Sequence, residues 1–153
     1  MIRQFRLQDA QSCCQLIHAC LESDSSLTPM LRRKIRRMET PQSMMERARL
    51  FYVAIFEEGN RIVGVAGLDL NEIRLLCVLP NRQRSGIGRI LLDHIKAMVP
   101  GALFSDIFVY SSLQSAGFYK ACGFTEKGPC GFGLGEEILP TVFMTYPISL
   151  LNF

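Results

Sequence analysis

Blocks of alternating or recurring apolar positions along the chain predict its strands and helices. Residues 1–7 alternate apolar and polar side chains, which predicts an opening strand. After Asp9, a candidate N-cap, apolar residues recur at helical spacing as far as Cys20. A second helix is predicted to begin near Pro29, since proline suits the first turn, and a further short helix follows Pro41.

The middle of the chain predicts an antiparallel meander. Residues 50–56 are rich in aromatic and β-branched side chains, residues 57–60 form a turn, and residues 61–68 return as the partner strand. A second turn at residues 69–71 leads into a third strand over residues 72–79.

Helices and strands alternate in the last third. A helix is predicted from Gly86 to a stop at Pro100, with an apolar face of Ile87, Ile90, Leu91, Ile95 and Met98. Residues 102–110 predict a strand parallel to residues 72–79, because a helix connects the two. The remaining predicted elements are a helix over residues 112–121, a strand from residue 124, a mobile loop over residues 128–135 and a closing strand over residues 137–146.

Composition is that of a globular protein. The chain has 153 residues, of which 48% are hydrophobic and 20% charged, which predicts a single domain over residues 1–153. Neither a signal peptide nor a run long enough to span a membrane is evident, so we expect a cytoplasmic protein. The six cysteines form no CxxC pair and are interpreted as reduced thiols; no metal site is predicted.

A run of cations in the second helix offers two interpretations. A nucleic-acid or acidic-partner surface is one, and a solvated helix face opposite apolar residues is the other. We favour the solvated face because no aromatic side chains interleave with the charges, which are Arg32, Arg33, Lys34, Arg36 and Arg37.

The segment with the clearest chemistry is a basic, glycine-containing loop between residues 72–79 and the helix after Gly86. Glycines allow close backbone approach, and the free N–H groups and dipole of a helix N-terminus favour an anion, most often phosphate. A dinucleotide fingerprint would need a glycine at Leu91, and a P-loop would need Gly-Lys-Ser/Thr; both are absent. An ordinary strand-to-helix turn remains the alternative.

The pattern Gln83-x-x-Gly86-x-Gly88 resembles the pyrophosphate-binding signature of the GCN5-related N-acetyltransferases (GNAT). A second segment, Phe118-Tyr119-x-x-x-Gly123-Phe124, is similar to a late motif of the same family. The resemblance implies an α/β fold with a mixed central sheet of about seven strands, in the order strand, two helices, three strands, helix, strand, helix, two strands.

The resemblance also implies an acyltransferase that moves the acetyl group of acetyl-CoA to a primary amine. The coenzyme A pyrophosphate is expected on the loop and the pantetheine arm beside the strand before it, as an added strand between two that splay apart. A backbone N–H of that strand is expected to polarise the thioester carbonyl. The residues implied in cofactor binding are Cys77, Val78, Gln83, Arg84, Ser85, Gly86, Ile87, Gly88, Arg89, Ser112 and Tyr119. Ser112 stands where many relatives have asparagine.

Two residues are expected to carry the proton transfers. Tyr119 matches the family tyrosine that protonates the leaving thiolate, since a phenol holds its proton at neutral pH. Glu72 is the candidate general base, because its place fourteen positions before Gly86 resembles that of the catalytic glutamate in the histone-acetylating members of the family; partial burial is expected to raise its pKa. A solvated carboxylate beside Arg74, or a base acting through water, is the alternative. His18 and His94 are expected on helix surfaces.

A non-catalytic acyl-CoA-binding sensor on the same fold, and a nucleic-acid-binding module, remain as other function classes. The acceptor stays open among a small amine, an amino acid and a protein lysine, because carboxylates and arginines give opposing indications. We expect no nucleic-acid or membrane partner; many relatives dimerise, so a homodimer is kept as an alternative.

Overall fold

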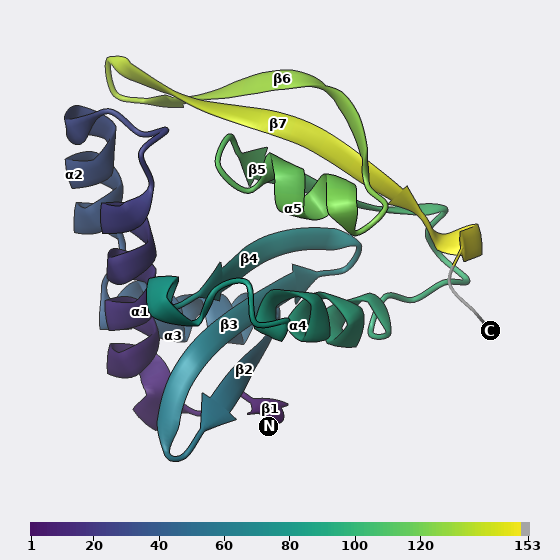
Figure 1. Cartoon of the computed structure of the whole chain (residues 1–153), viewed down its shortest axis with the longest axis horizontal. Coiled ribbons are helices and arrows are strands. Elements are labelled where there is room, and N and C mark those ends of the chain that lie inside the picture. The colour runs from purple at the N-terminus through teal and green to yellow at the C-terminus, as the bar shows by residue number, and fades with distance from the viewer. Residues whose placement is uncertain (151–153) are drawn as a thin grey trace.

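The computed structural model describes residues 1–150 and contains one seven-stranded sheet, in the order β1-β2-β3-β4-β5-β7-β6. This confirms the predicted α/β fold with a mixed sheet (Figure 1). Short 3-10 helices lie at Leu7–Asp9, Pro80–Arg82 and Ile148–Leu150. The main elements are β1 (Ile2–Gln4), α1 (Ala10–Ser23), α2 (Pro29–Met38), α3 (Pro41–Leu50), β2 (Tyr52–Glu58), β3 (Arg61–Asp69), β4 (Glu72–Val78), α4 (Ile87–Lys96), β5 (Asp106–Ser112), α5 (Ala116–Ala121), β6 (Thr125–Leu134) and β7 (Glu137–Pro147).

The first four strands form the predicted meander. Strands β1 to β4 pair antiparallel with their neighbours in chain order. The β2–β3 turn is made by Gly59 and Asn60, both at positive φ, as a tight hairpin requires. Strand β4 carries a bulge: Leu68 pairs with Ile73 and Gly67 with Leu75, which leaves Arg74 without a ladder partner.

Strands β4 and β5 are parallel, as predicted, but their pairing is brief. Glu72 pairs with Phe108 and Ile73 with Val109, and the two strands then separate. Figure 1 shows the β5–β7–β6 part of the sheet diverging from β4. The sheet is thus two antiparallel groups joined at one end.

Two predicted boundaries were wrong. Residues 102–105 precede β5 rather than belong to it, because the Leu103 N–H closes a turn onto the Pro100 carbonyl at 3.0 Å. Helix α5 begins at Ala116 rather than at Ser112, since the Ser115 N–H bonds to the Ser112 hydroxyl and carbonyl in the preceding turn.

The predicted mobile loop over residues 128–135 was also wrong, because most of it belongs to β6. Pro129 pairs with Val142 and Cys130 with Thr141. Strand β6 is the edge of the sheet, where proline and glycine are tolerated because one side of the strand needs no ladder bonds.

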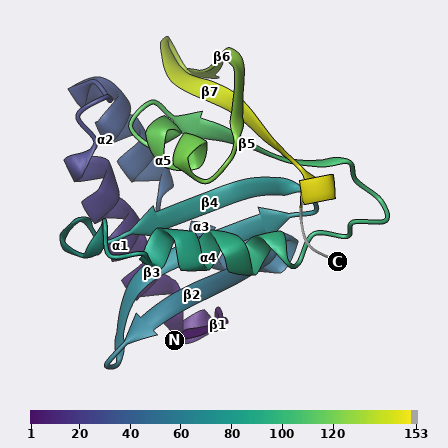
Figure 2. The same cartoon turned by 45° about the vertical axis from the view of Figure 1, so that its right-hand side comes forward.

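Helices cover both faces of the β2–β4 region (Figure 2), with α4 on one face and α1 and α3 on the other. Helix α4 buries Ile87, Leu91, Leu92 and Ile95, whereas the predicted face members Ile90 and Met98 are exposed. The buried face is therefore rotated around the helix, away from Ile90 and toward Leu92, relative to the predicted face.

Lys96 of this helix is buried although it carries a charge. Its Nζ lies 4.1 Å from the centroid of the Tyr146 ring, so a cation–π contact compensates for part of the lost hydration. No helix within residues 1–150 is long and apolar enough to cross a membrane.

Candidate functional site

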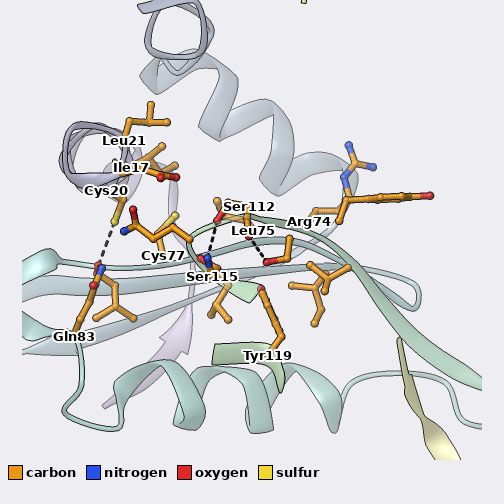
Figure 3. A pocket seen from close by; sticks show the side chains of 18 of the residues that line it. Ile17, Cys20, Leu21, Arg74, Leu75, Cys77, Gln83, Ser112, Ser115 and Tyr119 are labelled. Atoms are coloured by element: carbon orange, nitrogen blue, oxygen red, sulfur yellow. Dashed lines mark hydrogen bonds between the residues drawn. The ribbon is translucent and has the colours of Figure 1, made fainter. Parts of the chain in front are cut away.

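The separation of β4 from β5 opens a cavity of about 260 Å³. Its walls come from the C-terminal half of α1, from β4 between Ile73 and Val78, from the end of β5 and from α5. Figure 3 shows Cys20 and Cys77 on the α1 side of this cavity and Tyr119 across from them. An apolar floor and convergent polar groups are typical of a small-molecule site.

Backbone groups of β4 are exposed along this gap. The Leu79 N–H bonds to the Val63 carbonyl at 2.9 Å, and Cys77 pairs with Val65. Because N–H and C=O groups alternate in direction along an antiparallel strand, those of Leu76 and Val78 point into the gap. Cys77 therefore contributes its side chain to the cavity, and its neighbours contribute the backbone edge.

The loop after β4 is fixed to this edge. The Gln83 amide donates to the Val78 carbonyl at 3.0 Å, and Gly86 stands at the N-cap of α4 with φ of 89°. A Cβ at Gly86 would meet no atom within 4 Å, so open space lies above the loop. A Cβ at Gly88 would lie 3.1 Å from the Phe118 ring, so Gly88 allows α4 to pack on α5.

The start of α4 presents unpaired donors. The Ile90 N–H donates to the Gly86 carbonyl at 3.0 Å. The N–H groups before it have no carbonyl four residues earlier within the helix, so they are free to donate to a ligand. Arg84, at φ 61°, is exposed and makes no ion pair within residues 1–150. This geometry matches an anion site.

The other predicted loop residues have intramolecular roles. Arg82 pairs with Glu58 through bonds of 2.9 and 2.6 Å, and Arg89 donates to the Ala121 carbonyl at 3.1 Å. The Ser85 hydroxyl donates to the Arg82 carbonyl, which tightens the loop. Ile87 is buried in the core below it.

Tyr119 lines the cavity from α5. Its side chain is 4% exposed and packs edge-on against the rings of Phe118 and Phe124, each with centroids 5.3 Å away. Its hydroxyl makes no hydrogen bond to another residue in the described chain and borders the cavity. Burial raises the pKa of Tyr119 well above its ordinary value, so the phenol keeps its proton.

Ser112 and Glu72 occupy different surroundings. Ser112 lines the cavity at the end of β5. Glu72 begins β4 opposite Phe108, and the cavity wall starts one residue later, at Ile73. Desolvation raises the pKa of Glu72, Arg74 lowers it through a contact of 3.7 Å, and Asp69 raises it. The structure does not bring Glu72 and Tyr119 into one cavity wall.

Cys20 and Asp24 are among the cavity residues that the sequence interpretation missed. Both lie at the C-terminal end of α1, and no local pattern indicates that this end meets β4. The Asp24 carboxylate is buried and accepts from the Ser26 N–H at 2.9 Å. Arg32 holds the same loop by donating to the carbonyls of Asp24 and Leu27.

An aromatic cluster extends the cavity away from the glycine loop. Tyr110 lines the cavity, and its ring lies 5.0 Å from that of Phe132 and 5.1 Å from that of Phe143. Phe108 lies 5.8 Å from Phe143, and Tyr110 and Phe132 are exposed. Lys34 on α2 bonds to the Leu134 carbonyl at 3.1 Å and holds that helix beside the β6–β7 hairpin.

The histidines lie elsewhere and are half-buried rather than on open surfaces. His18 bonds to the Glu39 carbonyl at 2.7 Å, and His94 to the Tyr52 hydroxyl at 2.7 Å. Each joins two elements of the fold.

Comparison with known proteins agrees with this arrangement. The family model described as "Acetyltransferase (GNAT) domain" matches residues 27–140. The chain belongs to the GNAT acetyltransferase family. The resemblance drawn from the two sequence motifs is thereby confirmed.

Individual relatives are distant in sequence. An uncharacterized N-acetyltransferase of Chlorobaculum tepidum is 28% identical over 130 residues, which are 82% of this chain and 75% of that protein. A GCN5-related N-acetyltransferase structure from Rhodopseudomonas palustris has a TM-score of 0.89 at 18% identity, covering 96% of this chain and 94% of that one.

Two further solved structures that are similar to this chain carry the coenzyme. PaiA N-acetyltransferase of Thermoplasma acidophilum, in complex with coenzyme A, has a TM-score of 0.78 at 15% identity, covering 96% of this chain and 98% of that one. YncA of Salmonella typhimurium, with acetyl-CoA, has a TM-score of 0.70 at 16% identity, covering 100% and 96%. These structures show that the GNAT fold is shared.

Proposed function

We propose that residues 1–153 act as a single N-acetyltransferase domain that transfers the acetyl group of acetyl-CoA to a primary amine. The observation that carries this proposal is the gap between β4 and β5, with free donors of the glycine loop at one end and the Tyr119 phenol beside it. Six free thiols favour a reducing compartment, and we place the protein in the cytoplasm.

Coenzyme A fits the donors that line this site. The N–H groups of residues 84–88 would hold the pyrophosphate, with Arg84 adding charge and Gln83 and Ser85 holding the loop. The backbone edge of Leu76 and Val78, with Ser112 opposite, would bind the amides of the pantetheine arm as an added strand. The bound coenzyme supplies an activated thioester.

The residues then divide the chemistry. The amine nitrogen forms a bond to the thioester carbonyl carbon, and a backbone N–H of β4 stabilises the resulting oxyanion. The C–S bond breaks, and Tyr119 donates its proton to the departing thiolate. The ammonium loses one proton before attack and the nitrogen a second afterwards; one proton restores the Tyr119 phenol and the other is released, so the products are an amide, coenzyme A and one proton.

A base must take those protons, and Glu72 is our candidate. Its raised pKa suits the role, but it lies outside the cavity wall, so we propose that it acts through water. Direct proton loss to water remains the alternative.

The second candidate function is an acyl-CoA-binding sensor without turnover. It would use the same gap and loop but would not depend on Tyr119. The nucleic-acid-binding alternative is less well supported, because several α2 cations have intramolecular partners: Arg32 and Lys34 bind carbonyls, and Arg36 pairs with Glu22 at 2.7 Å.

Calorimetric titration with acetyl-CoA tests the cofactor site. The variants are Gly86→Glu and its matched control Gly86→Ala. Both place a Cβ at positive φ, which costs about 1–2 kcal/mol of backbone strain, but only the first adds a carboxylate over the loop. We expect the wild type and Gly86→Ala to bind and folded Gly86→Glu to lose binding.

Absence of binding by the wild type would overturn the proposal, and equal binding by all three proteins would remove the loop from the cofactor site. Release of coenzyme A thiol in the presence of a panel of primary amines then separates an enzyme from a sensor.

A further inference from the structure

We propose that Cys20 and Cys77 form a covalent modification site inside the cavity, a dithiol that exchanges with small disulfides and closes to an internal disulfide. This site is distinct from the acetyl-transfer chemistry. Its effect on coenzyme A binding rests on the proposed function, whereas the formation of the disulfide does not.

The first argument is position. Cys20 is on the last turns of α1 and Cys77 is on β4, 57 positions later, yet both side chains line one cavity. The Cys20 thiol donates to the Val78 carbonyl at 3.2 Å, so it lies beside the residue that follows Cys77, and both cysteine side chains pack against the same apolar cluster between α1 and the sheet. Both residues are partly exposed, so a small reagent in the cavity can reach them (Figure 3).

The second argument is a contrast with the other thiols of α1. Cys13 and Cys14 are buried, and burial raises the pKa of each, to about 12 for Cys13. The pKa of Cys20 is lowered instead, mainly by the neighbouring Cys77 thiol. Because the thiolate is the nucleophile in exchange reactions, Cys20 is the attacking thiol and Cys77 the resolving one.

The reaction balances with a small disulfide, RSSR, as the oxidant. The Cys20 thiolate attacks one sulfur, forms a mixed disulfide and releases RS⁻, which takes up a proton. Cys77 then loses its proton and attacks the Cys20 sulfur, which forms the Cys20–Cys77 bond and releases a second RSH. Two thiol hydrogens and two electrons have passed to RSSR.

The consequence follows from where the sulfurs lie. The Val78 edge is the strand edge that would receive the pantetheine arm, and Cys20 already contacts it. A disulfide would fix α1 against β4 at this place, and the mixed disulfide would fill the cavity with the R group. Either form should exclude coenzyme A.

The experiment treats the full-length reduced protein with hydroxyethyl disulfide and follows intact mass, peptide mapping and calorimetric binding of acetyl-CoA. The variants are Cys20→Ser, Cys77→Ser and, as the matched control, Cys14→Ser, whose thiol is also hydrogen-bonded on α1 but to the Glu39 carbonyl. We expect the wild type and Cys14→Ser to lose about 2 Da and to yield a Cys20–Cys77 cross-linked peptide. Cys77→Ser should stop at the mixed disulfide on Cys20, and Cys20→Ser should remain unmodified in the cavity.

Acetyl-CoA affinity should fall by about tenfold or more on oxidation and return with a thiol reductant. A cross-link through any other cysteine pair, or modification of Cys77 without Cys20, would overturn the proposal. A mapped Cys20–Cys77 disulfide in a protein whose reduced form binds no acetyl-CoA would instead show that the proposed function fails while the modification site stands.

Discussion

The side-chain amide of Gln83 donates a 3.0 Å hydrogen bond to the carbonyl of Val78, so the loop that begins α4 is held against the strand edge that lines the gap. This contact holds the glycine loop and the exposed edge of β4 in one fixed geometry. It also gives the predicted role of Gln83 a physical basis.

Replacing Gln83 by alanine should weaken acetyl-CoA binding about tenfold, since one neutral hydrogen bond that orients the loop is lost. Calorimetry measures the change. Gln42→Ala on the exposed surface of α3 is the control and should bind as the wild type does. Unchanged affinity in Gln83→Ala would mean that the loop holds its shape without this bond.

Tyr119→Phe should lower kcat by about a hundredfold and leave the acetyl-CoA Kd within about twofold, because the ring packing is kept and the proton donor is removed. Tyr52→Phe removes a hydroxyl that bonds to His94 outside the cavity and is the matched control for phenol loss. Equal kcat in Tyr119→Phe and wild type would remove Tyr119 from the chemistry.

The same tyrosine makes a prediction about alkaline pH. Burial raises the pKa of Tyr119 above its ordinary value near 10. At any pH below about 10 the phenol should therefore keep its proton, and kcat should not fall because of Tyr119 ionisation. A decline of wild-type kcat near pH 8–9 that disappears in Tyr119→Phe would contradict this assignment.

The base assignment predicts the acidic limb of the pH profile. If Glu72 takes the proton, kcat/KM rises as pH increases through the raised pKa of Glu72, and Glu72→Gln should abolish that limb. Arg74 lowers this pKa, so Arg74→Gln should move the limb to higher pH. Asp24→Asn tests the carboxylate that does line the cavity; a limb that vanishes in this variant and persists in Glu72→Gln would assign the base to Asp24 instead.

The exposed aromatic cluster predicts an effect confined to the acceptor. Phe132→Ala should raise the amine KM several-fold, since an exposed ring beside Tyr110 is removed, and should leave acetyl-CoA affinity unchanged. Steady-state kinetics with a fixed amine and calorimetry with acetyl-CoA separate the two effects. A matched loss of both would show that the variant disturbs the β6–β7 pair.

Much of this arrangement could be predicted from local sequence, because its determinants are local. The loop signature, the crossover helix and the hairpin at Gly59 and Asn60 each depend on residues adjacent in the chain. The α3 helix, with its Thr40 cap, was likewise anticipated as a short helix after Pro41, although the family order of two helices omits it.

The wrong predictions arise where contacts between residues far apart in the sequence determine the local structure. Glycines in residues 128–135 predict a loop, but pairing with β7 makes most of them an edge strand. Cys20 and Asp24 reach the cavity because α1 packs on β4, a contact between segments far apart in sequence. The burial of Lys96 depends on a ring from the last strand.

A buried ion pair at the start of the chain predicts acid sensitivity. Arg3 donates to both carboxylate oxygens of Asp9 at 2.8 and 3.0 Å, and this bond is the main cause of the lowered pKa of Asp9. A depressed folded-state pKa stabilises the fold above the unfolded value near 4, and that stability is lost as pH falls through the folded value.

Arg3→Met should therefore reduce the free energy of unfolding at pH 7 by about 3 kcal/mol, because it removes the guanidinium from the buried Asp9 carboxylate and also breaks the pair with Glu57. Arg36→Met breaks the exposed pair with Glu22 and should cost under about 1 kcal/mol. Denaturant titration at neutral pH compares the two, and equal losses would show that the Arg3 pair is effectively solvated.

Strands β4 and β5 pair only at Glu72 and Ile73 and then separate, so the sheet consists of two groups of strands that are joined at these two positions. A ligand that forms hydrogen bonds with β4 and β5 along the gap would connect the two groups of strands, and these would then unfold as one cooperative unit. When the ligand binds, amide exchange of Leu76 and Val78 in β4 and of Ser112 in β5 should slow together, even though β4 and β5 do not pair at these positions. Binding of a ligand in the gap would thus be detected as slower amide exchange on both sides of the gap.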